Sequence, residues 1–115
     1  MPMTARAGSR SREPWPTDAV EAIALQKVLA GQVITDDRLG EVRFVAGLDV
    51  GPGAADGEVR AAVAVLSFPD LRTADQAVVR RPVSFPYVPG LLSFRETPVL
   101  LDALDQLGQL PDLLL

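Results

Sequence analysis

The spacing of apolar residues changes along the chain, and the first spacing is helical. Four apolar residues fall on one helical face: Val20, Ile23, Ala24 and Val28. Asp18 followed three residues later by Glu21 is typical of a capped helix start, and Gly31 is typical of a helix end. These positions predict a helix between Asp18 and Gly31.

The next three segments carry the β-branched and apolar pattern of strands, at residues 42–50, 59–68 and 73–81. The first segment is apolar almost throughout, which predicts a central strand buried on both faces. The third segment alternates more, which favours a position at an edge of the sheet. Turn residues separate the three segments, so we expect an antiparallel meander.

A second helix and a returning strand are expected after the meander. Thr97 followed by Pro98 is typical of a helix start, and Gly108 is typical of a helix end. Four leucines repeat between them: Leu100, Leu101, Leu104 and Leu107. A strand starting near Asp112 would return through this helical connection and make the sheet mixed. The order β-β-β-α-β therefore predicts an α/β fold with a mixed sheet.

Composition limits the class of protein. The chain has 115 residues, of which 48% are hydrophobic, and this is enough for a globular core in residues 15–115. Residues 1–14, rich in Arg, Ser and Pro, predict a flexible leader. The net charge of -4 argues against a large basic face, although nucleases that bind metal ions are acidic at their sites.

Three absences from the sequence narrow the chemistry further. There is no cysteine, which excludes disulfides and zinc-thiolate sites, and no histidine, which excludes an imidazole base. No apolar stretch approaches the roughly 20 residues needed to span a bilayer, and the first residues lack the pattern of a signal peptide. We expect a cytoplasmic protein without a membrane segment.

Two carboxylates are candidates for a metal site. Asp49 closes the first predicted strand and Glu96 precedes the second predicted helix, so the order of elements can bring them together. Oxygen ligands suit Mg²⁺ or Mn²⁺, which can polarise a phosphodiester and lower the pKa of a bound water. Each acid also has a structural interpretation, as a turn former at Asp49 and as a complement to the helix dipole at Glu96.

The stretch FPYVPGLLSFRE, residues 85–96, places Tyr87 in a proline-rich loop. The loop could be a rigid surface turn with a packed ring. Three apolar residues after it are expected in the core: Leu91, Leu92 and Phe94. Arg95 could pair with Glu96 or with a phosphate.

Three stretches together resemble endonuclease V, the deoxyinosine-directed DNA repair nuclease. They are FVAGLDVG at 44–51, AAVAVLSFPDL at 61–71 and FPYVPGLLSFRE at 85–96, the last followed by PDLLL. The resemblance covers residues 44–115. It implies a ribonuclease H-like fold, in which helices flank a central mixed sheet.

The resemblance also implies roles for single residues. Asp49 matches the family's first metal-ligating aspartate and Glu96 the glutamate that completes the acidic cluster, so both would be catalytic and would hold Mg²⁺ or Mn²⁺. The proline-rich loop matches the wedge that enters the duplex at the lesion. Its DNA-binding residues would be Pro86, Tyr87, Val88, Pro89, Gly90 and Leu91. Because proline fixes φ, the wedge would be ordered before it meets DNA.

The implied reaction is hydrolysis of the second phosphodiester bond on the 3′ side of a deaminated base, with metal-activated water as the nucleophile. The base would be turned out of the stack into a pocket. The partner would be DNA containing deaminated bases, and the full-length form would be a monomer.

The family's Val-Asp-Gly motif, and its later lysine and histidine, have no counterpart in this sequence. We therefore expect a truncated N-terminal part of the nuclease, inactive and marginally stable when alone. One alternative is a DNA-binding module that recognises the lesion without catalysis. Another is a nuclease directed at inosine in RNA.

Overall fold

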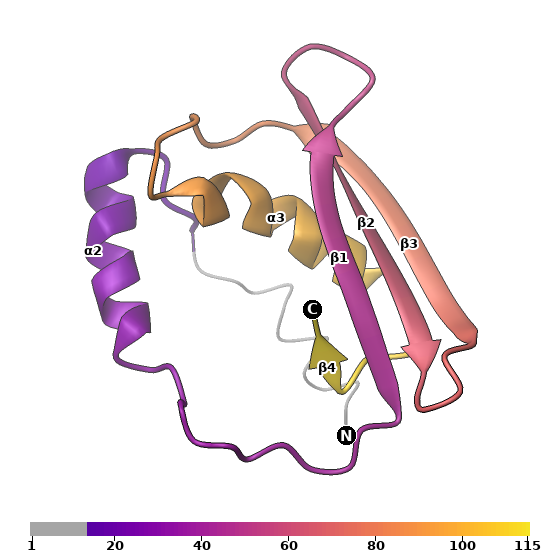
Figure 1. Ribbon diagram of the computed structural model, residues 1–115. Helices are drawn as coiled ribbons and strands as arrows, with labels where there is room; N and C mark the ends of the chain where they lie inside the picture. Colours follow the sequence, from indigo (N-terminus) through magenta and orange to yellow (C-terminus); the bar gives the residue numbers. More distant parts are fainter. Residues whose placement is uncertain (1–13) are drawn as a thin grey trace.

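A mixed four-stranded sheet is the centre of the computed structural model, which describes residues 14–115 (Figure 1). The strands β1 (Phe44–Pro52), β2 (Glu58–Ser67) and β3 (Thr73–Pro82) form an antiparallel meander, and β4 (Leu113–Leu114) pairs parallel to β1. The strand order is β3-β2-β1-β4. The predicted meander, the edge position of the third strand and the mixed sheet are confirmed. The predicted leader lies outside the described residues, except for Pro14.

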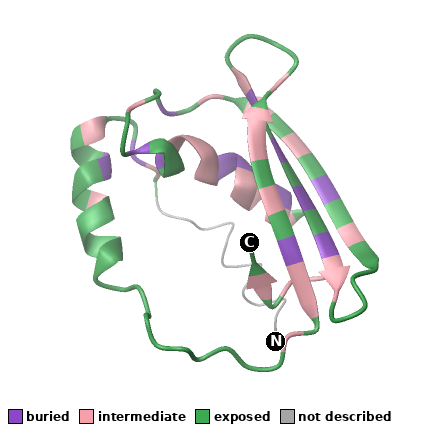
Figure 2. Ribbon diagram, in the orientation of Figure 1, coloured by how far each residue is buried: buried purple, intermediate pink, exposed green. Residues whose placement is uncertain are grey.

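One face of the sheet is buried and the other is open in the described part of the chain. The inward residues of β2 are buried: Val59, Ala61, Val63 and Val65. They pack under helix α3 (Leu92–Asp105), which contacts all three strands of the meander (Figure 2). Gly47 and Asp49 on β1 point to the opposite face and are exposed. The expectation that the first strand is buried on both faces is therefore wrong for residues 14–115, because α3 covers only one face.

Helix α2 (Ala19–Ala30) begins and ends where the sequence predicts. The Asp18 side chain caps it by accepting a hydrogen bond from the Glu21 N–H at 2.9 Å, and Gly31 is its C-cap. Glu21 departs from the usual capping box, since its Oε1 accepts from the Thr17 N–H at 3.3 Å. The described helices are too short or too polar to cross a membrane.

The buried face of α2 is not the predicted one. Its four predicted inward residues are all exposed: Val20, Ile23, Ala24 and Val28. The helix instead uses Ala19, Ala22 and Leu25 to pack on a second cluster of buried residues. Residues on almost every side of α2 are apolar, so the partner decides which face is buried, and the partner is the start of α3.

This second cluster joins α2 to the start of α3. Trp15 packs against this cluster, which contains four buried residues: Ala22, Phe85, Leu91 and Phe94. The ring centroids of Phe85 and Phe94 are 5.9 Å apart, and those of Trp15 and Phe94 are 5.4 Å apart. These aromatic contacts fix the position of the proline-rich loop, because Phe85 and Leu91 flank it.

Helix α3 begins at Leu92, so the predicted start at Thr97 is wrong and Pro98 lies inside the helix. Proline has no N–H to donate to the carbonyl of the residue four positions earlier, which is Phe94. The Trp15 indole Nε1 donates to that carbonyl at 2.7 Å. A side chain far away in the sequence therefore satisfies the group that proline leaves without a partner, and the helix passes through Pro98.

Two aspartates hold the return from α3 to β4. Asp75 Oδ2 accepts hydrogen bonds from the N–H groups of Gly108 and Gln109 at 2.7 and 2.9 Å. Asp112 Oδ2 accepts from the N–H groups of Arg43 and Phe44 at 2.9 and 3.0 Å. One carboxylate ties the return to β3 and the other ties it to the start of β1.

These contacts predict a loss of stability in acid. Backbone N–H donors from Gln109, Gln76 and Gly108 lower the pKa of Asp75, and those of Arg43 and Phe44 lower the pKa of Asp112. The stabilisation is present above the ordinary aspartate pKa of about 4 and is lost as pH falls toward the lowered values. In urea unfolding at a series of pH values, Asp75→Asn/Asp112→Asn should show a weaker loss of unfolding free energy below about pH 4 than the unchanged chain.

The matched control is Asp36→Asn/Asp56→Asn, which removes two charges at exposed positions. This control should keep the acid sensitivity of the unchanged chain. Equal pH dependence in the two double variants would contradict the stabilising role of Asp75 and Asp112.

Candidate functional site

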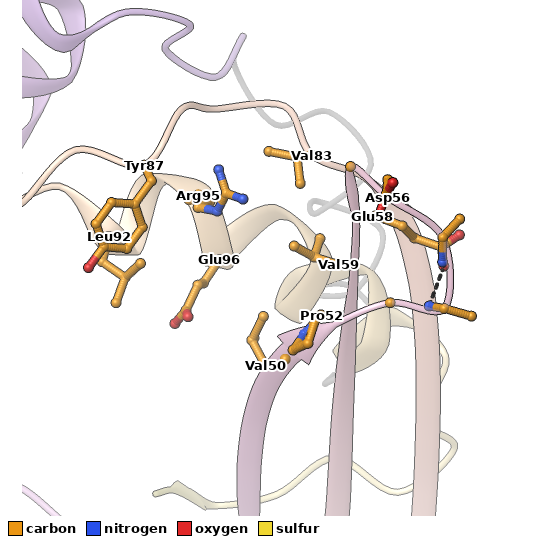
Figure 3. A pocket seen from close by; sticks show the side chains of 15 residues that line it. Val50, Pro52, Asp56, Glu58, Val59, Val83, Tyr87, Leu92, Arg95 and Glu96 are labelled. Atoms are coloured by element: carbon orange, nitrogen blue, oxygen red, sulfur yellow. Dashed lines mark hydrogen bonds between the residues drawn. The ribbon is translucent and has the colours of Figure 1, made fainter.

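A pocket of about 430 Å³ opens at the carboxyl end of β1 (Figure 3). One wall is the β1–β2 hairpin, residues 50–59. The other wall comes from the loop before α3 and from its first turn: Val83, Tyr87, Leu92, Arg95 and Glu96. The pocket therefore combines the end of a central strand, a helix start and an exposed aromatic ring.

The hairpin wall is shaped by Glu58. Its Oε1 accepts hydrogen bonds from the N–H groups of Ala54 and Ala55 at 3.0 and 3.4 Å, and its carbonyl accepts from Gly53 at 2.8 Å. A Cβ at position 53 would collide with the Glu58 side chain, so glycine is required there. Glu58 organises the loop, and its contacts make it a structural residue of the wall.

Sequence reasoning identified these hairpin residues as a turn but did not place them in a site. The available signal was the concentration of glycine and proline directly after Asp49: Gly51, Pro52, Gly53 and Gly57. Such residues after a buried strand favour a loop whose backbone is closely approached.

The proline-rich loop presents Tyr87 to solvent on a fixed backbone. Tyr87 is 71% exposed, so the interpretation of a packed ring is wrong. After it, the Leu91 N–H donates to the Val88 carbonyl at 2.9 Å, and Gly90 has a φ of +85°. Pro89 followed by a glycine at positive φ is typical of a type II turn. The loop is thus closed by a turn directly before α3.

Arg95 restrains the other end of the loop. Its Nη1 donates to the Phe85 carbonyl at 3.0 Å, and Phe85 is 1% exposed. Arg95 therefore has a structural role and forms no ion pair with Glu96 within residues 14–115, whereas its contact to a phosphate stays a prediction. Tyr87 is consequently held between a buried phenylalanine and a closed turn.

Leu91 differs from its neighbours in the loop. Its side chain is 5% exposed and packs in the cluster with Phe85 and Phe94. Leu91 is therefore a core residue, as one of the two interpretations predicted. Its side chain is too buried to contact DNA. Pro86 and Pro89 are exposed and Val88 is half-buried beside Tyr87.

The turn can be tested at Gly90. Gly90→Ala should destabilise the chain by about 1–2 kcal/mol, because a side chain is strained at a φ of +85°. Apart from its chain neighbours, no heavy atom of residues 14–115 lies within 4 Å of the added Cβ, so the cost is conformational rather than steric. Urea unfolding measures the difference.

Gly47→Ala is the matched control, since Gly47 lies in β1 with open space around an added Cβ and no positive φ. This substitution should be neutral or stabilising by up to about 1 kcal/mol. Equal effects at Gly90 and Gly47 would show that the turn conformation does not matter for stability.

The two candidate carboxylates do not share a pocket. Glu96 is half-buried in the pocket beside Tyr87, whereas exposed Asp49 lines a depression of about 520 Å³ on the open sheet face. The two residues after Asp49, Val50 and Gly51, line the Glu96 pocket. The structure brings Glu96 to the end of the strand that carries Asp49, and convergence of the two carboxylates stays a prediction.

The carboxylates of Asp49 and Glu96 are the right type of ligand for a divalent cation, but two are too few to form a complete site. Carboxylate oxygens are the ligands that Mg²⁺ and Mn²⁺ prefer, and these ions use about six ligands. Within residues 14–115, no group of three or more Asp, Glu, His or Cys side chains is placed to hold a metal. Asp49 and Glu96 as metal ligands stay a prediction, and two carboxylates would supply only part of such a site.

A family model of endonuclease V matches residues 27–115. Endonuclease V of Trichormus variabilis is 53% identical over 104 residues, which is 89% of this chain and 47% of the relative. Endonuclease V of Roseiflexus castenholzii is also 53% identical, over 102 residues covering 89% of this chain and 45% of the relative. The chain spans about half the length of the curated relatives it matches.

Solved structures support the same assignment. Endonuclease V of Streptomyces avermitilis superposes with a TM-score of 0.80 at 42% identity, over 87% of this chain and 45% of the other. Endonuclease V of Ciona intestinalis has also been solved, bound to DNA containing an inosine followed by a ribo-adenosine. It superposes with a TM-score of 0.65 at 26% identity, over 74% of this chain and 37% of the other. The fold of these neighbours is ribonuclease H-like, so the expected fold class is confirmed. The chain belongs to the endonuclease V family.

Proposed function

We propose that this chain supplies one half of a nuclease that cleaves DNA at deaminated bases. The observation that carries the proposal is the pocket at the end of β1, where an exposed tyrosine on a restrained loop and a carboxylate lie together. Membership of the endonuclease V family and the inosine-containing DNA bound by the Ciona relative support the choice of substrate.

The wedge consists of Pro86, Tyr87, Val88, Pro89 and Gly90. An exposed aromatic ring can fill the gap left in a duplex and stack on a neighbouring base. The turn at Gly90 and the Arg95 contact to Phe85 hold the backbone on both sides of this ring before DNA arrives. Little ordering entropy is then lost on binding.

Asp49 and Glu96 would hold Mg²⁺ or Mn²⁺ together with ligands from the rest of the family domain. A bound divalent cation supplies polarisation of the phosphodiester and a water of lowered pKa. The residues of this chain position that chemistry at the second phosphodiester bond on the 3′ side of the lesion. With two carboxylates alone, cation affinity should be too low for cleavage by residues 1–115.

The test is a hybrid protein that joins residues 1–115 to the part of the Trichormus variabilis relative beyond its match to this chain. The hybrid should nick a duplex that contains one deoxyinosine when Mg²⁺ is added, while an undamaged duplex stays intact. Residues 1–115 alone should leave both duplexes uncut. A folded hybrid that does not nick deoxyinosine DNA, or cleavage by residues 1–115 alone, would contradict the proposal.

One observation favours a second candidate, cleavage of inosine-containing RNA. The nucleic acid bound by the Ciona relative carries a ribo-adenosine after its inosine. Comparing kcat/KM of the hybrid for matched ribo- and deoxyinosine strands separates the two substrates. Preference for the ribose strand would favour the second candidate.

Tyr87 should contribute to lesion recognition. In the hybrid, Tyr87→Ala should weaken binding to deoxyinosine duplex by roughly 1–3 kcal/mol, the scale of one base-aromatic stack. Tyr87→Phe keeps the ring and should bind like the unchanged hybrid. Fluorescence anisotropy in Ca²⁺ measures affinity, and an equal loss for undamaged duplex would show that the ring does not recognise the lesion.

A further inference from the structure

Two arginines face each other on the open side of the sheet. Arg60 on β2 is paired in register with Arg80 on β3, and both are exposed. Directly opposite residues share one face, with Cβ atoms about 5 Å apart, and like charges in that arrangement are destabilising. The pair therefore needs an explanation beyond the fold.

The acidic residues of the described part of the chain do not neutralise this pair. Three other arginines form ion pairs, namely Arg38 with Asp36, Arg72 with Asp70, and Arg81 with Asp102. No ion pair or hydrogen bond engages Arg60 or Arg80 within residues 14–115. Two guanidinium groups with unused donors can bind an anion with bidentate geometry.

The arginine pair lies next to Asp49. Gly51 on β1 is in register with Arg60, and Asp49 is two residues before Gly51 on the same face. Arg60 is thus the diagonal cross-strand neighbour of Asp49. The Cα atoms of such neighbours are about 7–8 Å apart. Gly51 has no side chain between them, so an anion bound by the arginines would lie beside Asp49.

We infer that Arg60 and Arg80 bind phosphates of the nucleic acid backbone that passes over Asp49. The inference rests on the proposed function and adds a phosphate-binding surface on β2 and β3, outside the Tyr87 pocket. Phosphate contacts fix register along a nucleic acid without reading its sequence. Because the net charge of the chain is -4, the attraction has to be local.

The salt dependence of DNA binding tests this surface on residues 1–115. A labelled, undamaged 30-bp duplex is titrated by anisotropy from about 50 mM to about 200 mM salt. Arg60→Ala/Arg80→Ala should lower affinity at about 50 mM salt about tenfold, and the slope of log K against log salt should flatten by about 1.8, or about 0.9 per contact. Arg38→Ala/Arg72→Ala removes the same charge from paired arginines and should change neither quantity.

Any outcome other than these expected results would overturn the inference. The surface does not bind phosphate if residues 1–115 show no salt-dependent binding, or if both double variants weaken it equally. Inorganic phosphate at millimolar concentration should compete weakly with the duplex; complete competition would mean a free-phosphate site.

The hybrid separates failure of the inference from failure of the proposed function. Its nicking activity tests the nuclease, and the slope change caused by Arg60→Ala/Arg80→Ala tests the surface. If this double variant lowered the Tm of the hybrid and left DNA binding unchanged, the arginines would pair with protein carboxylates. The phosphate surface would then be wrong, although the hybrid remained a nuclease.

Discussion

Asp49→Asn in the hybrid should lower the rate of deoxyinosine nicking by at least about 100-fold while lesion binding stays within about twofold. Loss of a group that only orients a metal ligand costs about 10–100-fold in affinity or activity, so loss of a ligand itself should cost more. Asparagine keeps the shape of the side chain and removes its charge. Single-turnover nicking in Mg²⁺ and anisotropy without catalysis measure the two effects.

The same substitution should leave folding nearly unchanged. Asp49 is exposed on the open sheet face, and within residues 14–115 its Oδ1 accepts a hydrogen bond only from the adjacent Val50 N–H, at 3.0 Å. An asparagine oxygen can accept the same bond. A Tm close to that of the unchanged hybrid would separate a lost ligand from a lost fold.

Asp36→Asn is the matched control, because Asp36 is exposed and pairs with Arg38 at 3.6 Å in the loop before β1. It removes one carboxylate charge far from the strand end and should nick normally. If Asp49→Asn kept half of the normal nicking rate, the assignment of Asp49 as a metal ligand would be wrong.

Local signals predicted those elements whose hydrogen bonds are local. Asp18 caps its own helix through Glu21, and Gly31 ends it, so these boundaries are visible in a short stretch of sequence. The meander was predictable for the same reason, since turns of a few residues join its strands.

Long-range contacts explain the errors. The proline rule placed a helix start at Pro98, but the carbonyl that Pro98 leaves free is satisfied by Trp15, 79 residues before Phe94. The buried face of α2 likewise depends on where Phe85 and Phe94 lie. Neither arrangement is encoded near the residues it affects, so periodicity and caps alone could not predict it.

The candidate site shows the same division. The Pro-Gly turn and the exposed Tyr87 follow from local residues, whereas the Arg95 contact to Phe85 appears only in the folded chain. Asp49 shows a further limit: the sequence predicted that Asp49 closes the strand, but β1 continues to Pro52, and the face that Asp49 occupies depends on strand alternation relative to α3.

Trp15→Ala should destabilise the chain by about 3 kcal/mol or more, the largest stability effect expected of these substitutions. It removes a half-buried ring that packs on Phe94 and the N–H that donates to the Phe94 carbonyl at 2.7 Å. Large-to-small changes of aromatic residues cost about 3–5 kcal/mol when buried, and an unsatisfied carbonyl adds about 1–3 kcal/mol. Urea unfolding followed by circular dichroism measures the free energy.

A double-mutant cycle isolates the hydrogen bond from the packing. Trp15→Phe keeps an aromatic ring and removes the donor, so it should cost about 1–2 kcal/mol in the chain with Pro98. Pro98→Ala restores a backbone N–H that can donate to the Phe94 carbonyl within α3. The cost of Trp15→Phe should then fall by about 1 kcal/mol in the Pro98→Ala background. Equal costs in the two backgrounds would mean that Trp15 stabilises α3 through packing alone, and that Pro98 is tolerated for another reason.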